Sequence, residues 1–200
     1  MKNLLDIEER LNIKIRLIEP LLGTVPKDPE VYKRFIASKA PDSATGEQET
    51  ETVEEIEEGG WTGFHRDEKG LFIYNYMIKG FLKSACEVCM ATGIIKKIPA
   101  YKKWFDLLVF VEPRRISLGK DKPDGNLERP LRAMTAMGPR VTVCRSDYVN
   151  AGTEIDFTIR ILKNPKISQK TIKQILEYGR YVGLGQWRGS GGYGKFEVVE

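Results

Sequence analysis

Residues 183–194 read GLGQWRGSGGYG, and this stretch says most about which fold the sequence adopts. It follows a segment with helical periodicity and precedes a short apolar strand at residues 195–199. A dinucleotide-binding loop has the opposite order, strand before helix, and a phosphate-binding P-loop ends in Gly-Lys-Ser/Thr. Bare glycines let the backbone approach phosphate or another chain, while Trp187 and Arg188 offer a stacking face and a fork of N–H donors. The alternative is a tight connection that packs against a sheet.

Strands and helices are predicted along the rest of the chain from apolar periodicity and capping residues. A half-buried strand ends at Pro20, a helix covers residues 78–97, and Ser168 caps a second helix that reaches about Tyr181. Further strands are expected at residues 71–74, 104–112 (a central strand), 140–144 and 154–162. Strand–helix–strand occurs twice in this order. The pattern favours an α+β fold with a modified ferredoxin-like (RRM-like) core in a single domain, residues 1–200.

Two long excursions interrupt that core. Residues 24–70 form an insertion after the first strand, which is expected to be partly mobile because residues 41–60 are polar and acidic. Residues 47–58 hold seven glutamates and no base, so the rest of the chain carries +11, the +4 of the whole chain plus these seven charges. Residues 113–139 form a basic, thumb-like excursion. A basic body with an acidic insertion indicates an anionic polymer as partner, and solvated surface charge is the alternative.

Composition excludes several classes of protein. The 200 residues are 41% apolar and 30% charged, which is typical of a globular domain, and no apolar run is long enough to cross a membrane. The only histidine, His65, is expected in a solvated loop, so histidine-based catalysis is not expected. Cys86 and Cys89 are interpreted as buried thiols on a helix, and with Cys144 they fit a reduced, cytoplasmic setting. The sequence predicts no metal and no cofactor.

A second cluster of candidate residues lies where a strand and turn lead into the first helix. Lys79 and Lys83 fall near the predicted helix start, where cations are unfavourable for the helix itself but suit a bound phosphate. Two solvated lysines are the alternative interpretation.

Four segments in this order resemble the RAMP superfamily, and within it the backbone subunits of CRISPR effector complexes. They are the first strand and its turn, the strand-to-helix junction YNYMIKGFLK, the basic thumb-like region with the turn after it, and the terminal glycine-rich loop (residues 13–23, 74–83, 114–157 and 183–196). Residues 75–77 read Asn-Tyr-Met, where the family has proline-glycine-serine. The resemblance implies a modified ferredoxin-like fold, guide RNA held along its backbone, and head-to-tail assembly of copies with other effector-complex subunits in an antiviral ribonucleoprotein.

The resulting hypothesis is a non-catalytic subunit that binds single-stranded RNA in the cytoplasm and oligomerises along it. Six basic residues are expected to meet phosphates, and three apolar or aromatic residues to stack on or wedge between bases. The phosphate set is Lys79, Lys83, Arg129, Arg132, Arg140 and Arg188, and the base set is Met134, Met137 and Trp187.

Two other functions stay open at this point. Some family members cleave target RNA with an aspartate in the loop after the first strand, and Asp28 is the nearest candidate for such a metal-dependent ribonuclease. The other is a viral protein that mimics or inhibits such a complex.

Overall fold

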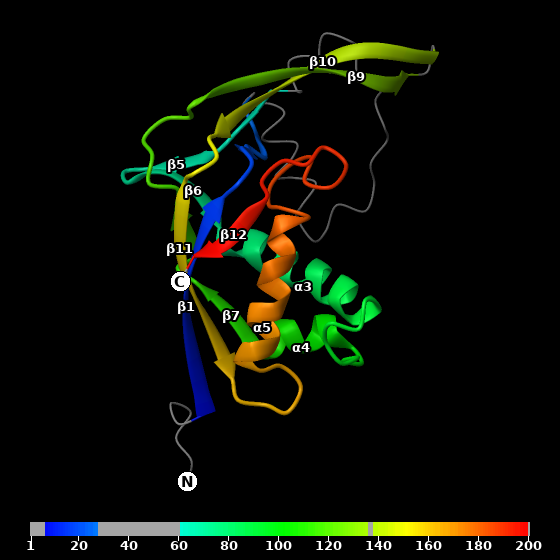
Figure 1. Ribbon diagram of the computed structural model, residues 1–200. Helices are drawn as coiled ribbons and strands as arrows, with labels where there is room; N and C mark the ends of the chain where they lie inside the picture. Colours follow the sequence, from blue (N-terminus) through cyan, green and yellow to red (C-terminus); the bar gives the residue numbers. More distant parts are fainter. Residues whose placement is uncertain (1–6, 28–60, 136–137, 200) are drawn as a thin grey trace, which may run out of the picture.

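The computed structural model describes residues 7–27, 61–135 and 138–199 (Figure 1). Most of the predicted insertion, with its glutamates and Asp28, lies outside the described residues, and so does Met137. The described part is mixed α+β, as predicted, with three α-helices and three β-sheets. None of its helices is long and apolar enough to cross a membrane.

A four-stranded antiparallel sheet forms the centre of the molecule. Its strands lie in the order β12-β1-β11-β7, comprising β1 (Glu8–Leu17), β7 (Val109–Glu112), β11 (Glu154–Leu162) and β12 (Phe196–Val199). The alternation that predicted the first strand is confirmed, because Ile13, Ile15 and Leu17 are buried while Arg16 is exposed. Period-two alternation places every second side chain on the same face of the sheet, so one face is apolar and the other charged.

Helices cover the apolar face of this sheet (Figure 1). They are α3 (Asn75–Ala91), α4 (Tyr101–Leu108) and α5 (Gln169–Leu176), and α5 continues into the 3₁₀-helix η2 (Glu177–Arg180). Phe81 of α3 meets Phe196 of β12 edge to face, with ring centres 5.0 Å apart, and both rings are fully buried. Ser168 caps α5 as predicted, since its hydroxyl accepts a hydrogen bond from the Thr171 backbone N–H.

Two predicted elements are wrong in their limits or type. The first helix begins at Asn75 and ends at Ala91, because the Asn75 amide donates to the Val111 carbonyl and Gly93, just beyond the end, has a φ of +76°. Residues 101–108 form α4 and only residues 109–112 form a strand, which is an edge strand rather than a central one. The apolar run that begins at Trp104 fits a strand, but it also fits a helix that buries Phe105 together with its neighbours one turn away.

The basic excursion, residues 113–139, supplies the first arm of a long β-hairpin that projects from the core, and the strand predicted at residues 140–144 belongs to its second arm (Figure 1). Its arms are β9 (Gly125–Thr135) and β10 (Gly138–Val149), paired in antiparallel register from Gly125↔Tyr148 to Thr135↔Gly138. The base of β10 joins three short strands, β2 (Leu21–Leu22), β3 (Val25–Pro26) and β4 (Trp61–Gly63). The hairpin is therefore anchored on segments from both ends of the insertion.

His65 lies in a short strand and not in a solvated loop. It belongs to a three-stranded sheet of β5 (His65–Asp67), β6 (Gly70–Tyr74) and β8 (Arg115–Ser117). Its ring stacks on Phe72 at 5.4 Å between centres and meets Tyr74 edge-on at 4.7 Å. Burial, followed by the nearby Arg115 charge, lowers the pKa of His65, so the ring is neutral at physiological pH.

Candidate nucleic-acid interface

The glycine-rich loop, residues 183–194, is closed at its neck by its own backbone. The Leu184 N–H donates to the Gly194 carbonyl at 2.9 Å, and the Gly194 N–H donates to the Pro20 carbonyl at 2.8 Å. A Cβ on Gly183 would overlap the backbone of Gly194, and Gly194 itself has a φ of +68°. Glycine is required at both positions, and the loop is thereby fixed next to the turn that follows β1.

Trp187 adopts a backbone conformation that is uncommon for a bulky residue. Its φ is +52°, and its carbonyl accepts the Tyr193 N–H at 3.4 Å across the tip of the loop. A Cβ on Gly191 would lie 2.5 Å from the Trp187 carbonyl oxygen, so the tip is tightly folded. A non-glycine residue in this region costs about 1–3 kcal/mol, which surrounding contacts must offset. The backbone thus presents the Trp187 and Tyr193 rings from the same turn.

Arg129 of β9 packs against both of these rings. Its guanidinium carbon lies 4.1 Å from the Trp187 ring centre and 5.1 Å from that of Tyr193. Each such cation–π contact contributes about 0.5–2 kcal/mol, the more so when water is excluded. Its Nη1 atom is buried and finds no hydrogen-bond partner within the described ranges. Arg129 therefore connects the hairpin to the loop through stacking rather than through an ion pair.

A buried cluster of polar groups holds Gln186, the residue before Trp187. The Thr62 and Ser146 hydroxyls lie 2.8 Å apart and 3.2 and 3.3 Å from the Gln186 Oε1 atom. Thr62 comes from β4 and Ser146 from β10, where the two strands run parallel. Buried polar groups that satisfy one another fix side-chain positions, so this cluster sets the loop against the hairpin base.

A second tryptophan, Trp61, lies beside this cluster and is held by charged groups. The Lys27 ammonium lies 4.2 Å from its ring centre, and the Arg145 guanidinium 5.9 Å. Asp147, which is only 5% exposed, accepts hydrogen bonds from the Lys27 ammonium at 2.8 Å and from the Trp61 indole N–H at 3.3 Å. Trp61 was not among the residues predicted from the sequence. Its signal was an aromatic residue directly after Gly59-Gly60.

We call this arrangement the junction site. Two half-buried tryptophans lie at the base of the projecting hairpin, Trp187 on the face that carries Arg129 and Trp61 on the face that carries Arg145. Aromatic rings with cations close by suit sequence-tolerant contact with single-stranded nucleic acid. The junction site comprises Lys27, Trp61, Arg129, Arg145, Asp147, Gln186, Trp187 and Tyr193. Of the predicted residues, Arg129 and Trp187 belong to it, and Arg188 is exposed next to Trp187.

The structure places Lys79 and Lys83 elsewhere. They lie in the second and third turns of α3, not at its start, and their ammonium groups are 3.6 and 2.6 Å from a carboxylate oxygen of Asp106 on α4. The hydrogen bond from Lys83 is the largest cause of a lowered pKa for Asp106, which is consistent with a stable ion pair. These lysines therefore connect two helices.

The remaining predicted residues lie further along the hairpin. Arg132 and Met134 are on β9, opposite Val141 and Pro139, and Arg140 is on β10, opposite Ala133. The backbone thus aligns them with Arg129 along one projecting element.

The charged face of the four-stranded sheet has a different character. RRM domains stack bases on aromatic residues of a four-stranded sheet. Here its cations are paired with carboxylates of neighbouring strands, and Phe110 is the one aromatic residue that the described strands expose on it. The ion pairs are Arg10–Glu8, Lys14–Glu154, Arg16–Glu154, Arg160–Glu8 and Arg160–Glu112. Nucleic acid would have to displace these pairs. Lys27 and Arg145 of the junction site are paired as well, with Asp147 and Glu128, but the junction site adds two tryptophans and Arg129, which has no carboxylate partner within the described ranges, so it is the better candidate.

Comparison with known proteins supports the fold. No protein-family model and no curated protein matches the sequence. Among solved structures, the fold is similar to a chain in the cryo-EM structure of the Type III-B Cmr-beta bound to cognate target RNA, with a TM-score of 0.52 and 13% identity. The match covers 96% of this chain and 59% of that chain, so this chain spans less than two thirds of its length. The predicted resemblance to a CRISPR effector subunit is therefore supported at the level of the fold.

Proposed function

We propose that this chain is an RNA-binding backbone subunit of a CRISPR effector complex, which holds single-stranded guide RNA and assembles head to tail with copies of itself. The observation that carries this proposal is the junction site, where the base of the hairpin carries Trp187 with Arg129 on one face and Trp61 with Lys27 and Arg145 on the other. The similarity in fold to a chain of a complex bound to target RNA is consistent with it.

The core is proposed to be ferredoxin-like. Its order is β1-α3-β7 followed by β11-α5-β12, and its sheet order, β12-β1-β11-β7, is what two such units form when they interleave. We further propose that the chain is one domain in which residues 24–70 are an insertion and residues 113–139 act as a thumb. Because the thumb and the glycine-rich loop meet at Arg129, RNA held there would contact both.

Roles within the junction site follow from exposure and pairing. Trp61 and Trp187 are half-buried and would stack on bases, while Arg188 is exposed and would contact phosphate. Arg129 is assigned a positioning role, because its guanidinium lies against Trp187 and Tyr193. The hairpin residues Arg132, Met134, Met137 and Arg140 remain proposed contacts, and Lys79 and Lys83 are left out because both ammonium groups share the carboxylate of Asp106.

Fluorescence anisotropy with several unrelated single-stranded RNAs tests this function. We expect similar affinities for all of them and a steep fall with salt, because phosphate contacts supply most of the binding. Trp61→Ala should weaken binding to every RNA, at a cost of about 1–3 kcal/mol per lost stacking contact. Tyr181→Ala is the matched control, since Tyr181 is 71% exposed and lies just before the loop but outside the junction site.

Three results would contradict the proposal. Unchanged affinity of Trp61→Ala, with its melting temperature preserved, would remove the junction site from the RNA interface. Cleavage of guide-paired target RNA with Mg²⁺, abolished by Asp28→Ala, would favour the ribonuclease instead. Failure of the wild-type protein to bind any RNA would favour an inhibitor or mimic.

A further inference from the structure

A concave basic surface lies at the end of α5 away from the glycine-rich loop. It encloses a volume of about 480 Å³ between the segment that joins α3 to α4 and the start of α5. That volume falls within the range of roughly 300–1,000 Å³ typical of small-molecule sites. Four lysines line it, and no acidic residue does: Lys96, Lys97, Lys166 and Lys170. We call it the lysine cavity.

These lysines differ in their pairing from the cations of the charged sheet face. Lys14, Arg16 and Arg160, for example, lie within ion-pair distance of carboxylates. None of the four cavity lysines has a carboxylate partner within the described ranges, and the Lys166 ammonium lies over a ring, 3.8 Å from the Trp104 ring centre. Four like charges gathered around one cavity repel one another, and a bound anion would relieve that repulsion.

The rest of the lining indicates which kind of anion fits. Apolar side chains of the α3–α4 segment and of the turn before α5 form its walls: Ile94, Ile95, Ile98, Pro99 and Pro165. A nucleotide has this mixed character, because it joins a charged phosphate to a flat, largely apolar base. An isolated carboxylate side chain would use the charge but not the walls. The site does not depend on the helix terminus, since the Ser168 hydroxyl already caps the Thr171 N–H at 3.2 Å.

We propose that the lysine cavity binds the phosphate of a nucleotide, with Lys166 and Lys170 as its principal cationic contacts. Two sources share this chemistry, a free mononucleotide and the terminal phosphate of an RNA strand. The cavity is separate from the junction site, so it does not depend on the function proposed above.

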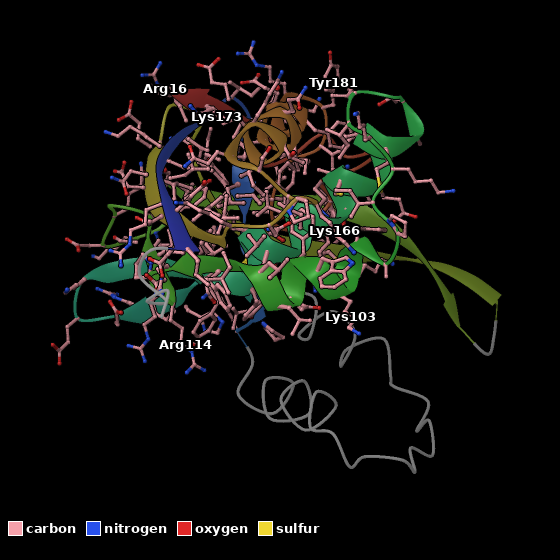
Figure 2. All side chains as sticks on the ribbon, turned by 90° about the horizontal axis from the view of Figure 1, so that it is seen from below. Arg16, Lys103, Arg114, Lys166, Lys173 and Tyr181 are labelled. Atoms are coloured by element: carbon pink, nitrogen blue, oxygen red, sulfur yellow. The ribbon has the colours of Figure 1, made fainter. Side chains whose placement is uncertain are left out.

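Isothermal titration calorimetry of the full chain with AMP tests the proposal. We expect saturable binding of AMP, weaker binding of inorganic phosphate and none of adenosine. The double variant Lys166→Ala/Lys170→Ala should weaken AMP binding at least tenfold. Lys173→Ala is the matched control, because Lys173 is an exposed lysine of the same helix that does not line the cavity, and it should change the affinity less than twofold. Figure 2 shows Lys166 and Lys173 well apart when the molecule is seen from below.

A second variant distinguishes loss of AMP binding from loss of folding. Lys170→Gln keeps a long polar side chain on an exposed position and should still weaken AMP binding with an unchanged melting temperature. A 5′-phosphorylated RNA tetranucleotide, compared with its 5′-hydroxyl form, separates the sources. Preference for the phosphorylated strand indicates an RNA terminus, and binding of AMP alone indicates a free nucleotide.

Three results would overturn the proposal. They are the absence of saturable AMP binding, equal weakening by Lys173→Ala and the double variant, and equally tight binding of a short polyglutamate peptide. The junction-site variant Trp61→Ala should leave AMP binding unchanged, so failure at one site is distinguishable from failure at the other.

Discussion

The guanidinium carbon of Arg129 lies 4.1 Å from the ring centre of Trp187, and this contact joins the projecting hairpin to the glycine-rich loop. Trp187 holds its ring there despite a φ of +52°. The stacking of Trp187 on Arg129 helps to offset the strain of the Trp187 backbone, so the positions of the hairpin and the loop are coupled. Any RNA that engages one of them meets the other in a defined place.

A double-mutant cycle measures that coupling. Arg129→Ala and Trp187→Ala should each lower the free energy of unfolding, and the double variant should lose less than the sum because both remove the same contact. We expect a coupling energy of about 0.5–2 kcal/mol from urea denaturation. Arg129→Lys keeps the charge but not the planar group, so it should retain only part of the coupling. Additive effects would mean that the stack contributes nothing.

The neck of the glycine-rich loop gives a second prediction. Gly183→Ala places a Cβ against the backbone of Gly194, which cannot move without opening the Leu184–Gly194 hydrogen bond. We expect a loss of about 2 kcal/mol or more, and a melting temperature lower by about 4 °C or more. Gly189→Ala is the control, because a Cβ there meets no atom within 4 Å and its φ is not positive. It should change stability by less than about 0.5 kcal/mol. Equal melting temperatures would show that the neck opens freely.

Thiol reactivity gives a third prediction. Cys86 and Cys89 are fully buried on α3, and burial, with smaller contributions from Cys89 and Glu87, raises the pKa of Cys86 to about 11. At pH 8 only about one Cys86 in a thousand is a thiolate, and only the thiolate reacts. Cys144 on β10 is half-buried. Ellman's reagent should therefore react with close to one thiol per native protein molecule, and with all three thiols after unfolding. If mass spectrometry shows that Cys86 reacts rapidly in the native protein, that result would contradict the packing of α3.

The strands and helix caps with a local signal could be predicted from the sequence. The alternation around Ile15 and the serine that caps α5 each act within a few residues, so they are visible without the fold. The α3 boundaries were missed because tertiary contacts set them. The Asn75 amide reaches the Val111 carbonyl of β7, a contact that no local pattern contains. Helix α4 was missed because a short apolar run fits strand and helix alike.

The candidate site was only partly predictable for the same reason. Trp187 and Arg129 stood out by residue type, but their contact joins segments far apart in the sequence. Trp61 lies beside Arg145, at the same hairpin base, only because β4 pairs in parallel with β10 at Arg145 and Ser146. The sequence predicts phosphate contacts for Lys79 and Lys83 from their place near the helix start, and it does not show that Asp106 of α4 pairs with them. Pairing across elements decides which charges are available, and sequence alone does not show it.

The salt dependence of RNA binding tests the assignment of Arg188. This residue is exposed beside Trp187 and has no carboxylate partner among residues 7–27, 61–135 and 138–199. If it contacts one phosphate, Arg188→Ala should reduce the slope of log K against log salt by about 0.7 for a single strand, whatever the RNA sequence. Arg10→Ala is the matched control, since Arg10 is similarly exposed but pairs with Glu8 on the charged sheet face at 2.7 Å. It should leave the slope unchanged. A reduced slope for Arg10→Ala with none for Arg188→Ala would move the RNA from the junction site to the sheet, because each slope counts the counterions that the phosphates release.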